Sequence, residues 1–570
     1  MKDKLLKVLG SSFVFAFALN AVFLAACVLL TSFTFESTAD YYNSIYICRD
    51  HLYTNSDINY ILAMLIGTVQ YTFPNINCFV MFEVLASFAA FVSITFVFAD
   101  KYNKRKAFVF STLLNIMFAL HHYTNVDSTR TAALLCAAGF LLILLAVYQK
   151  RYSMSCWVGV IEILFGSFLN IAYFFIALGF GLAFFLGDLI AKKKYRLPFR
   201  KFFWYFRPFL LMFALVSVLS LGLHQFSYTV NHATEETSVF YEYSLTKNSI
   251  SEQPFPSFSE HEEEFREVDV DENDYELLKN GYYDESTSLN VDSLKAVRKM
   301  QLQDTPKNFA NTLLSVFKDN YEEVLHLNRS IIVISVYLAV SLLFIIYHKN
   351  RFSFFPLFYF IVGYISSFIL RFFFSGSNNV TYGLWLFMIV MLFNSFNFDL
   401  HRSQNPNNKL RRHNGYLIIS CALVAVLATA NGLIYINSRT VHNEKNSARF
   451  LFSEMERNPD YYYVMDPATK EKFVKNTENY LHPMWGFRDG YLDNLDDFGY
   501  SHNDITLRKR NLPQNIYRAV MTDKKIFVID NNIVFKKERY FTKHYAQDGA
   551  RASYVLTSDP GGYKIYKVTT

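Results

Sequence analysis

Eleven runs of apolar residues dominate this 570-residue sequence, and each is close to the length that a helix needs to cross a membrane. A hydrocarbon core of roughly 30 Å requires about 20 such residues. The runs lie at 12–33, 74–99, 107–120, 131–148, 154–170, 171–190, 208–226, 330–347, 353–370, 379–397 and 416–436. Of the residues, 52% are hydrophobic and only 18% are charged. This composition argues against an ordinary soluble enzyme, because too few charged residues are present to cover so much apolar surface. We expect an α-helical polytopic membrane protein with about eleven transmembrane helices.

The fifth and sixth runs are continuous over 154–190. A single straight helix of that length would overshoot a bilayer, because each residue adds about 1.5 Å. We therefore divide the run at Asn170 and expect a hairpin of two helices.

The distribution of Lys and Arg predicts the orientation. With the amino terminus inside, 22 of them fall in the segments on the inner side, whereas the short outer loops hold only Arg49, Arg130 and Arg371. The positive-inside rule then gives a multi-pass protein of the cell membrane with a cytoplasmic amino terminus and an extracytoplasmic carboxyl terminus. A cleavable signal peptide is the alternative for the first run, but its apolar core is longer than the usual range of about 7–15 residues.

Two large polar segments interrupt the apolar runs. They give four expected domains: a transmembrane module at 1–226, an acidic extracytoplasmic loop at 227–329, a second transmembrane module at 330–440 and an extracytoplasmic α/β domain at 441–570. The acidic loop is rich in aromatic residues, so we expect it to be ordered, with helices at Val291–Gln303 and Asn308–Leu327. The net charge of +6 forms no basic patch, and no nucleic-acid partner is predicted.

The last segment has the pattern of a small α/β domain. The expected strands are Tyr461–Met465, Lys525–Ile529 and Tyr563–Val568, and the expected helices are Pro467–Asn476 and Val534–His544. The turn Asp559–Gly562 is expected to join the last two of these strands in a hairpin. The sequence contains no GxxxxGK[ST], GxGxxG or HExxH motif. This absence argues against a nucleotide-hydrolysing domain within the chain.

The first outer loop carries the main candidate for chemistry. Asp40 follows the first span by a few residues, where a lipid-linked substrate would present its head group, and it could deprotonate an acceptor hydroxyl there. The alternative is that Glu36 and Asp40 only solvate a loop. Tyr41 is included in the expected substrate-binding set.

A second outer loop holds His122, Asp127 and Arg130 within ten residues. Arg130 could grip a phosphate, and Asp127 could assist Asp40 or hold a divalent cation, the one cofactor considered. The alternative is that Asp127 and Arg130 cap helix ends. Arg371, at the outer end of the ninth span, is a second phosphate candidate, and snorkelling to the interface is its alternative.

Glu83 and Glu162 lie within predicted spans. Intramembrane acids are rare and are often functional in transporters. The alternative is that each is buried against hydroxyl groups or Asn170.

Several short motifs resemble those of the GT-C superfamily of polytopic membrane glycosyltransferases, in a poorly characterised bacterial branch. They are Asp40-Tyr41-Tyr42 in the first loop, Asn59 and Leu62 with Ile66-Gly67 in a juxtamembrane helix, Pro74 to Asn77 opening the second span, and Asp274 to Leu278 followed by Asp284 in the large loop. The chain departs from this pattern at Ala39, where the family often has a second acid, and at Asn170, where an Arg is common.

The resemblance implies an enzyme that transfers a sugar from a polyprenyl-phosphate donor to a cell-envelope glycan or lipid on the outer side of the membrane. It implies Asp40 as general base, Asp127 as supporting acid or cation ligand, and Arg130 and Arg371 as phosphate-binding residues beside Tyr41 and His122. The expected partners are the lipid-linked sugar, the acceptor and membrane lipids. Alternatives are a transporter or flippase of envelope lipids or polymers, and a non-catalytic envelope scaffold.

Overall fold

The computed structural model separates into two compact units, each assembled from three stretches of the chain. Unit 1 comprises 1–31, 82–226 and 308–440, and unit 2 comprises 32–81, 227–307 and 441–570. The structure describes residues 11–30, 33–35, 38–49, 51–54, 56–102, 104–150, 154–191, 199–251, 254–304, 310, 313, 314, 316, 328–347, 353–374, 380–396, 422, 426, 430, 447–476, 494–499, 515–532, 534–547 and 549–570.

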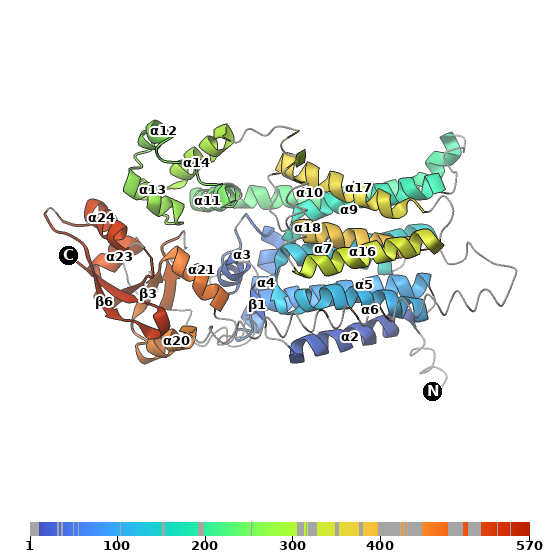
Figure 1. The fold of residues 1–570 in the computed structure, drawn as a ribbon, viewed down its shortest axis with the longest axis horizontal. Helices are drawn as coiled ribbons and strands as arrows, with labels where there is room; N and C mark the ends of the chain where they lie inside the picture. Colours follow the sequence, from blue (N-terminus) through green and yellow to red (C-terminus); the bar gives the residue numbers. More distant parts are fainter. Residues whose placement is uncertain are drawn as a thin grey trace. The chain divides into compact units, whose positions relative to one another are not determined.

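Unit 1 is built from long apolar helices that lie alongside one another (Figure 1). Described residues form helices at ten of the eleven predicted runs: α2 (Ser12–Leu30), α5 (Cys78–Lys101), α6 (Lys104–Thr124), α7 (Ser128–Gln149), α8 (Met154–Leu169), α9 (Ile171–Ala191), α10 (Phe199–Asn231), α16 (Asn328–Tyr347), α17 (Phe355–Phe374) and α18 (Val380–Ser395). The eleventh, 416–436, lies outside the described residues except for three isolated positions.

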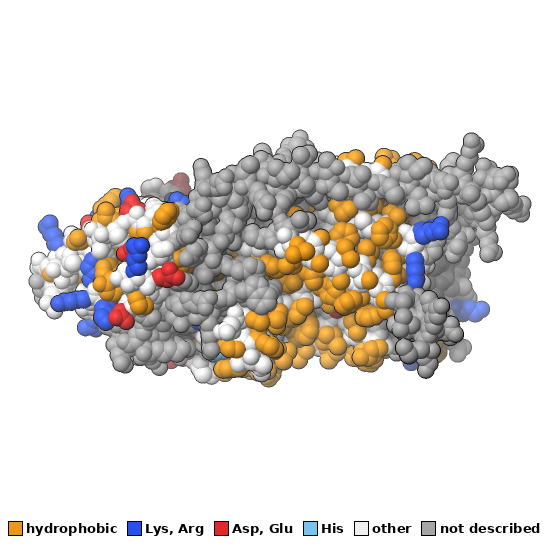
Figure 2. Space-filling model, turned by 90° about the horizontal axis from the view of Figure 1, so that it is seen from below, with side chains coloured by type: hydrophobic (Ala, Val, Ile, Leu, Met, Phe, Trp, Pro, Cys, Tyr) orange, Lys and Arg blue, Asp and Glu red, His pale blue; other side chains and the backbone are white. Residues whose placement is uncertain are grey.

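Four helices among the described residues are long and apolar enough to cross a membrane: Ser12–Leu29, Cys78–Lys101, Ser128–Gln149 and Arg207–Asn231. Several others are apolar but shorter. Large apolar side chains of α2 and α10 are exposed, among them Val22, Leu29 and Val218. On the face drawn in Figure 2, hydrophobic side chains gather over the helices of unit 1, whereas charged side chains are interspersed on unit 2. A helix that exposes apolar residues in this way suits lipid rather than water.

The predicted break at Asn170 is confirmed. Helix α8 ends at Leu169 and α9 begins at Ile171. The Asn170 side-chain oxygen accepts a hydrogen bond from the backbone N–H of Ala172 at 3.0 Å, as an N-cap residue does. Two helices, rather than one long helix, therefore occupy 154–190.

A buried polar contact ties three helices of unit 1 together. The Asn20 amide of α2 donates to the Thr95 hydroxyl of α5 at 3.0 Å, and the Asn115 amide of α6 donates to the Asn20 side-chain oxygen at 2.9 Å. Such hydrogen bonds add directional attraction between helices that are apolar elsewhere.

Helices α7 and α8 pack with their backbones close together. A Cβ atom added at Gly139 would lie 2.3 Å from the Gly159 carbonyl oxygen, and one at Gly159 would lie 2.7 Å from the Gly139 carbonyl oxygen. Small residues allow this approach, which strengthens dispersion contacts between membrane helices.

We expect Gly139→Ala to lower the free energy of unfolding by about 1–3 kcal/mol, because the added methyl group must push backbone apart. Gly222→Ala in α10 is the matched control, since its Cβ would meet nothing within 4 Å. Thermal unfolding of the purified chain in detergent compares the two variants. Equal unfolding temperatures for both would show that α7 and α8 are not closely packed.

Unit 2 contains a five-stranded mixed sheet with the order β4-β3-β5-β7-β6. Its strands are β3 (Tyr462–Met465), β4 (Leu495–Asp497), β5 (Ile526–Ile529), β6 (Ser553–Ser558) and β7 (Ile565–Thr569). Strand β3 pairs in parallel with β4 and β5, and β7 pairs antiparallel with β5 and β6. The three predicted strands are confirmed, as are helices α21 (Pro467–Asn476) and α24 (Val534–His544). The turn at 559–562 does lie in a hairpin, but it joins β7 to β6 and not to the other predicted strand, β5. Strands β4 and β6 were not predicted.

The remaining helices of unit 2 come from all three of its stretches. They are α3 (Thr38–Ser44), the π-helical turn Ile45–Arg49, α4 (Tyr60–Thr72), α11 (Glu235–Ser251), α12 (Glu262–Glu267), α13 (Glu272–Lys279), α14 (Val291–Asp304), α20 (Ser447–Arg457) and α23 (Ile516–Thr522). The expected helix at 291–303 is confirmed, and the one at 308–327 lies largely outside the described residues. Phe240, Leu289, Val464 and Phe541 belong to one buried cluster, so the acidic loop and the sheet share a core.

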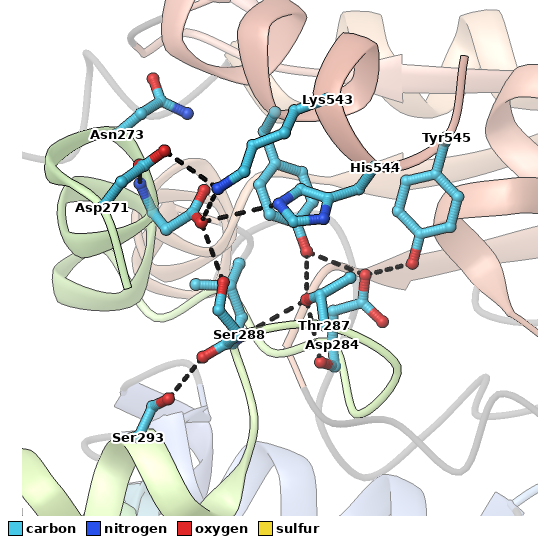
Figure 3. Close-up of polar contacts among 12 residues, drawn as sticks. Asp271, Asn273, Asp284, Thr287, Ser288, Ser293, Lys543, His544 and Tyr545 are labelled. Atoms are coloured by element: carbon cyan, nitrogen blue, oxygen red, sulfur yellow. Dashed lines mark hydrogen bonds and ion pairs between the residues drawn. The ribbon is translucent and has the colours of Figure 1, made fainter. Parts of the chain in front are cut away.

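Polar contacts join the acidic loop to α24 (Figure 3). The Lys543 ammonium lies 2.9 Å from the Asp271 carboxylate and 2.8 Å from the Asp274 carboxylate. Ser288 donates to Asp274 at 2.9 Å, and Asp284 accepts a hydrogen bond from Tyr540 at 2.9 Å. The acidic residues of this segment thus form hydrogen bonds and ion pairs with the α/β part of the unit. These contacts explain why a strongly acidic loop is folded.

Candidate functional site

Asp40 lies in the first turn of α3, eleven residues after the end of the candidate span Ser12–Leu29. A carboxylate in this position is favoured by the helix dipole. The side chain is buried, with 2% of its surface exposed. The interpretation that Asp40 merely solvates a loop does not fit this burial, whereas Glu36 lies outside the described residues.

The two tyrosines that follow Asp40 reach the edge of the sheet. The Tyr42 hydroxyl donates to Asp497 of β4 at 3.0 Å. The Lys470 ammonium of α21 forms an ion pair with the same carboxylate and lies 4.5 Å from the centre of the Tyr42 ring and 5.8 Å from that of Tyr41. Cation–π contacts of this kind gain strength when the ammonium group is desolvated. Helix α3 is therefore held to the sheet by charge as well as by packing.

Asp496 and Asp497 form a buried pair of carboxylates whose pKa values are driven apart. Burial, and then the charge of Asp497, raise the pKa of Asp496 to about 6. Burial also acts to raise the pKa of Asp497, but the charge and hydrogen bond of Lys470, the charge of Lys247 and the Gly499 N–H together hold that pKa below its ordinary value. The Tyr462 hydroxyl donates to Asp496 at 2.7 Å. A pair with one readily protonated member and one ionised member is what acid–base chemistry requires.

A second lysine comes from the acidic loop. The Lys247 ammonium of α11 lies 5.9 Å from the centre of the Tyr42 ring and 5.5 Å from that of Tyr243. Tyr243 raises the pKa of Lys247, burial lowers it, and Asp497 raises it further, with a net rise. We call this set the carboxylate-pair site; its members are Tyr41, Tyr42, Lys247, Lys470, Asp496 and Asp497. All three stretches of unit 2 contribute to it.

We expect Asp496→Asn to stabilise the protein at pH 8. The pKa of Asp496 in the fold, about 6, exceeds its ordinary value of 3.8, so its contribution to stability is fully present below about pH 3.8 and is lost as the pH rises through about 6. The amide imitates the protonated acid and should recover on the order of 3 kcal/mol at pH 8 and nothing near pH 4. Thermal unfolding at the two pH values measures this difference.

Asp497→Asn is the matched control, with the opposite sign. The pKa of Asp497 is lowered in the fold, so its contribution to stability is present above its ordinary pKa and is lost as the pH falls through the lowered value. The variant should therefore be less stable than the parent chain at pH 8. If both variants lowered the unfolding temperature at pH 8, the two carboxylates would not have the opposed environments described here.

The second outer loop lies in unit 1, and its residues contact one another. One Asp127 carboxylate oxygen accepts hydrogen bonds from the backbone N–H groups of Thr129 at 2.9 Å and Arg130 at 3.1 Å, and the other lies 3.2 Å from the Arg130 Nε. Asp127 is therefore the N-cap of α7, the alternative given by the sequence. His122 is buried, and its ring lies 5.6 Å from that of Phe91.

The predicted site residues thus fall in two separate sets. Asp40 and Tyr41 belong to unit 2, and His122, Asp127, Arg130 and Arg371 belong to unit 1. Arg371 lies in the last turn of α17, and its side chain is outside the described residues. Among the described side chains, no group of three or more His, Cys, Asp or Glu residues could hold a metal ion.

Four residues of the carboxylate-pair site were not predicted from the sequence: Lys247, Lys470, Asp496 and Asp497. One sequence pattern could have pointed to the sheet edge, because Asp466 follows β3 directly and Asp530 follows β5 directly. Carboxyl ends of neighbouring parallel strands lie at the same edge, where ligands of α/β folds commonly bind. The short strand β4, which ends in the two acids, has no apolar pattern of its own.

Comparisons with known proteins show no family for this chain. No family model matches it, and no solved structure matches it. A Saccharomyces cerevisiae protein, chromatin structure-remodeling complex protein RSC3, is 31% identical over 112 residues. That match covers 20% of this chain and 12% of the yeast protein, so the chain matches about an eighth of that protein's length.

Proposed function

We propose that this chain is a multi-pass membrane glycosyltransferase. It takes a sugar from a polyprenyl-phosphate donor and transfers it to a cell-envelope glycan or lipid on the outer side of the cytoplasmic membrane. The proposal includes about eleven membrane spans, a cytoplasmic amino terminus and an extracytoplasmic unit 2. The uneven distribution of Lys and Arg along the sequence supports this topology. The donor is lipid-linked because a nucleotide sugar is not supplied outside the membrane.

The observation that carries the proposal is the burial of Asp40 in α3, soon after a candidate membrane span. A carboxylate that is removed from water, yet connected by a short stretch of chain to a lipid-facing helix, suits a general base acting on a lipid-linked substrate. Its carboxylate takes the proton of the acceptor hydroxyl as the hydroxyl oxygen bonds to the sugar, and polyprenyl phosphate leaves.

The other proposed roles follow the charges. Arg130 and Arg371 bind the donor phosphate, with Tyr41 and His122 among the substrate-binding residues and Asp127 as supporting acid or cation ligand. The Arg130 guanidinium already forms an ion pair with Asp127, whose carboxylate lies 3.2 Å from its Nε, so only part of the guanidinium is left for a phosphate. We therefore assign Arg371 the larger share of phosphate binding.

A transporter or flippase is the second candidate, and one observation favours it. Glu83 and Glu162 are buried in helices of unit 1, with 1% and 4% of their surfaces exposed. The Glu162 carboxylate accepts a hydrogen bond from Ser93 at 2.6 Å, which is the burial against a hydroxyl group named above as its alternative, so the burial of the two acids alone favours transport. Buried intramembrane acids are typical of ion and proton pathways. Transport of a labelled lipid by the reconstituted chain, without sugar transfer, would favour this candidate.

We expect Arg371→Ala nearly to abolish labelling by a photoreactive polyprenyl-phosphate analogue, and Arg371→Lys to raise the apparent donor KM. Lysine keeps the charge but loses the two parallel hydrogen bonds of a guanidinium–phosphate pair. Arg130→Ala should have a similar but weaker effect. Unchanged labelling of both alanine variants would leave these arginines as anchors at the membrane interface.

A further inference from the structure

Unit 2 contains two of the six cysteines of the chain, Cys48 and Cys78. Cys48 lies in the π-helical turn Ile45–Arg49, directly after α3, and Cys78 is the first residue of α5. Both are free thiols in the structure, and both are buried, with 4% and 2% of their surfaces exposed. The other cysteines lie in the stretches of unit 1: Cys27, Cys136, Cys156 and Cys421.

The fold places the Cys48 sulfur at the start of α5. The backbone N–H groups of Phe79 and Cys78 both donate hydrogen bonds to this sulfur, and the Cys78 sulfur lies within electrostatic reach of it. A disulfide requires two Cα atoms that are about 4.4–6.8 Å apart. Because the Cys48 sulfur already contacts the backbone of Cys78, side-chain rotation can bring the two sulfurs together without moving the backbone.

Neighbouring groups hold both cysteines in this arrangement. The backbone N–H of Cys78 donates to the side-chain oxygen of Gln70, a buried residue of α4, at 3.0 Å. The backbone N–H of Leu52 donates to the Tyr46 carbonyl at 2.7 Å and so closes the turn that carries Cys48. The two thiols therefore face each other because the backbone on each side is fixed.

We propose that Cys48 and Cys78 form a disulfide bond on the outer side of the membrane. This inference rests on the extracytoplasmic placement of unit 2 proposed above, because disulfides form and persist in oxidising compartments. The oxidant is the disulfide of a thiol oxidase in the cell envelope. The two cysteine thiols lose two protons and two electrons as the S–S bond forms, and the disulfide of the oxidase is reduced to two thiols.

The bond forms while the first loop is folding. Burial raises the pKa of the Cys48 thiol to about 12, although the two backbone N–H groups act in the opposite direction. Because the thiolate is the reacting form, the buried thiol of the folded chain is a poor nucleophile. Oxidation therefore precedes the final packing, and the same burial then protects the disulfide from reductants.

The disulfide closes the loop 48–78, which contains α4. A cross-link of this kind stabilises a fold mainly by restricting the unfolded chain. It also ties the turn that follows α3 to the first residue of a candidate membrane span. Since α3 carries Asp40, the bond anchors the helix of the proposed general base.

The test counts thiols in the full-length chain, purified without reductant from a host with an envelope thiol oxidase. The chain is unfolded in detergent with N-ethylmaleimide, before or after reduction, and mass spectrometry counts the labels. We expect four labels before reduction and six after it, and a peptide pair joined through positions 48 and 78. Cys48→Ser and Cys78→Ser should each carry five labels in both conditions. Cys156→Ser in α8 is the matched control and should still gain two labels on reduction.

Six labels before reduction, or a disulfide that uses any other cysteine, would overturn the proposal. The Lys299→Cys variant, at an exposed position of α14, then identifies the reason. If a membrane-impermeant maleimide labels this variant in intact cells, unit 2 is outside and the two sulfurs do not come close enough to bond; if it does not, the proposed topology is wrong. Neither readout involves sugar transfer, so the proposed enzyme activity and this inference fail separately.

Discussion

Asp40→Asn is expected to reduce sugar transfer by at least about 10²-fold while leaving folding and membrane insertion unchanged, because the amide cannot accept the proton of the acceptor hydroxyl. The side chain is buried in α3 and is replaced by one of nearly equal size. The measurement is transfer from a polyprenyl-phosphate-linked sugar by the chain reconstituted in proteoliposomes.

Glu36→Gln is the matched control, since Glu36 is the other acid at the start of the same loop. It should affect transfer much less. If the Asp40 variant transferred sugar as fast as the parent chain, Asp40 would lose the role of general base, and α3 would remain an anchor for Tyr41 and Tyr42.

Lys537→Met is expected to lower the free energy of unfolding by about 3–5 kcal/mol. The Lys537 ammonium forms ion pairs with Asp530 and, at 3.1 Å, with Asp466, and all three side chains are at most 2% exposed. The Tyr282 hydroxyl also donates to Asp466 at 2.7 Å. Removal of the ammonium leaves two buried carboxylates without their counter-charge at the centre of the sheet edge.

Lys536→Met is the control, one residue earlier in α24. The Lys536 ammonium lies 3.5 Å from Glu276, and both side chains are partly exposed, so its loss should cost at most about 1 kcal/mol. Chemical denaturation of the purified chain, followed by tyrosine fluorescence, compares the two. Equal stability of both variants would show that the Asp466–Lys537–Asp530 contact is not a stabilising feature of unit 2.

Local sequence patterns predicted the helices and most of the sheet. Apolar runs predicted ten described helices, the length of 154–190 predicted the break at Asn170, and alternating apolar residues predicted β3, β5 and β7. Each of these features depends on residues close together in the sequence. Strand β4 was missed because its three residues, Leu495–Asp497, include two acids and carry no apolar alternation.

The composition of the units could not be predicted in the same way. The first loop, the acidic loop and the carboxyl-terminal stretch form one unit through contacts such as Tyr42 with Asp497 and Tyr282 with Asp466, which join residues far apart in the chain. Periodicity reports which face of an element is buried, but not which partner covers it. For the same reason Asp40 was found as a candidate from its place after a span, whereas Lys247, Lys470 and the acids of β4 were not found.

The most direct test of the proposed function is a transfer assay with the purified parent chain in proteoliposomes. The donor is a radiolabelled sugar on polyprenyl phosphate, and an envelope-lipid fraction supplies the acceptor. We predict that the chain moves the label into the acceptor and releases polyprenyl phosphate, and that Asp40→Asn abolishes most of this transfer. If label never leaves the polyprenyl carrier while the intact donor crosses the bilayer in the presence of the chain, the glycosyltransferase proposal is wrong and the flippase is supported.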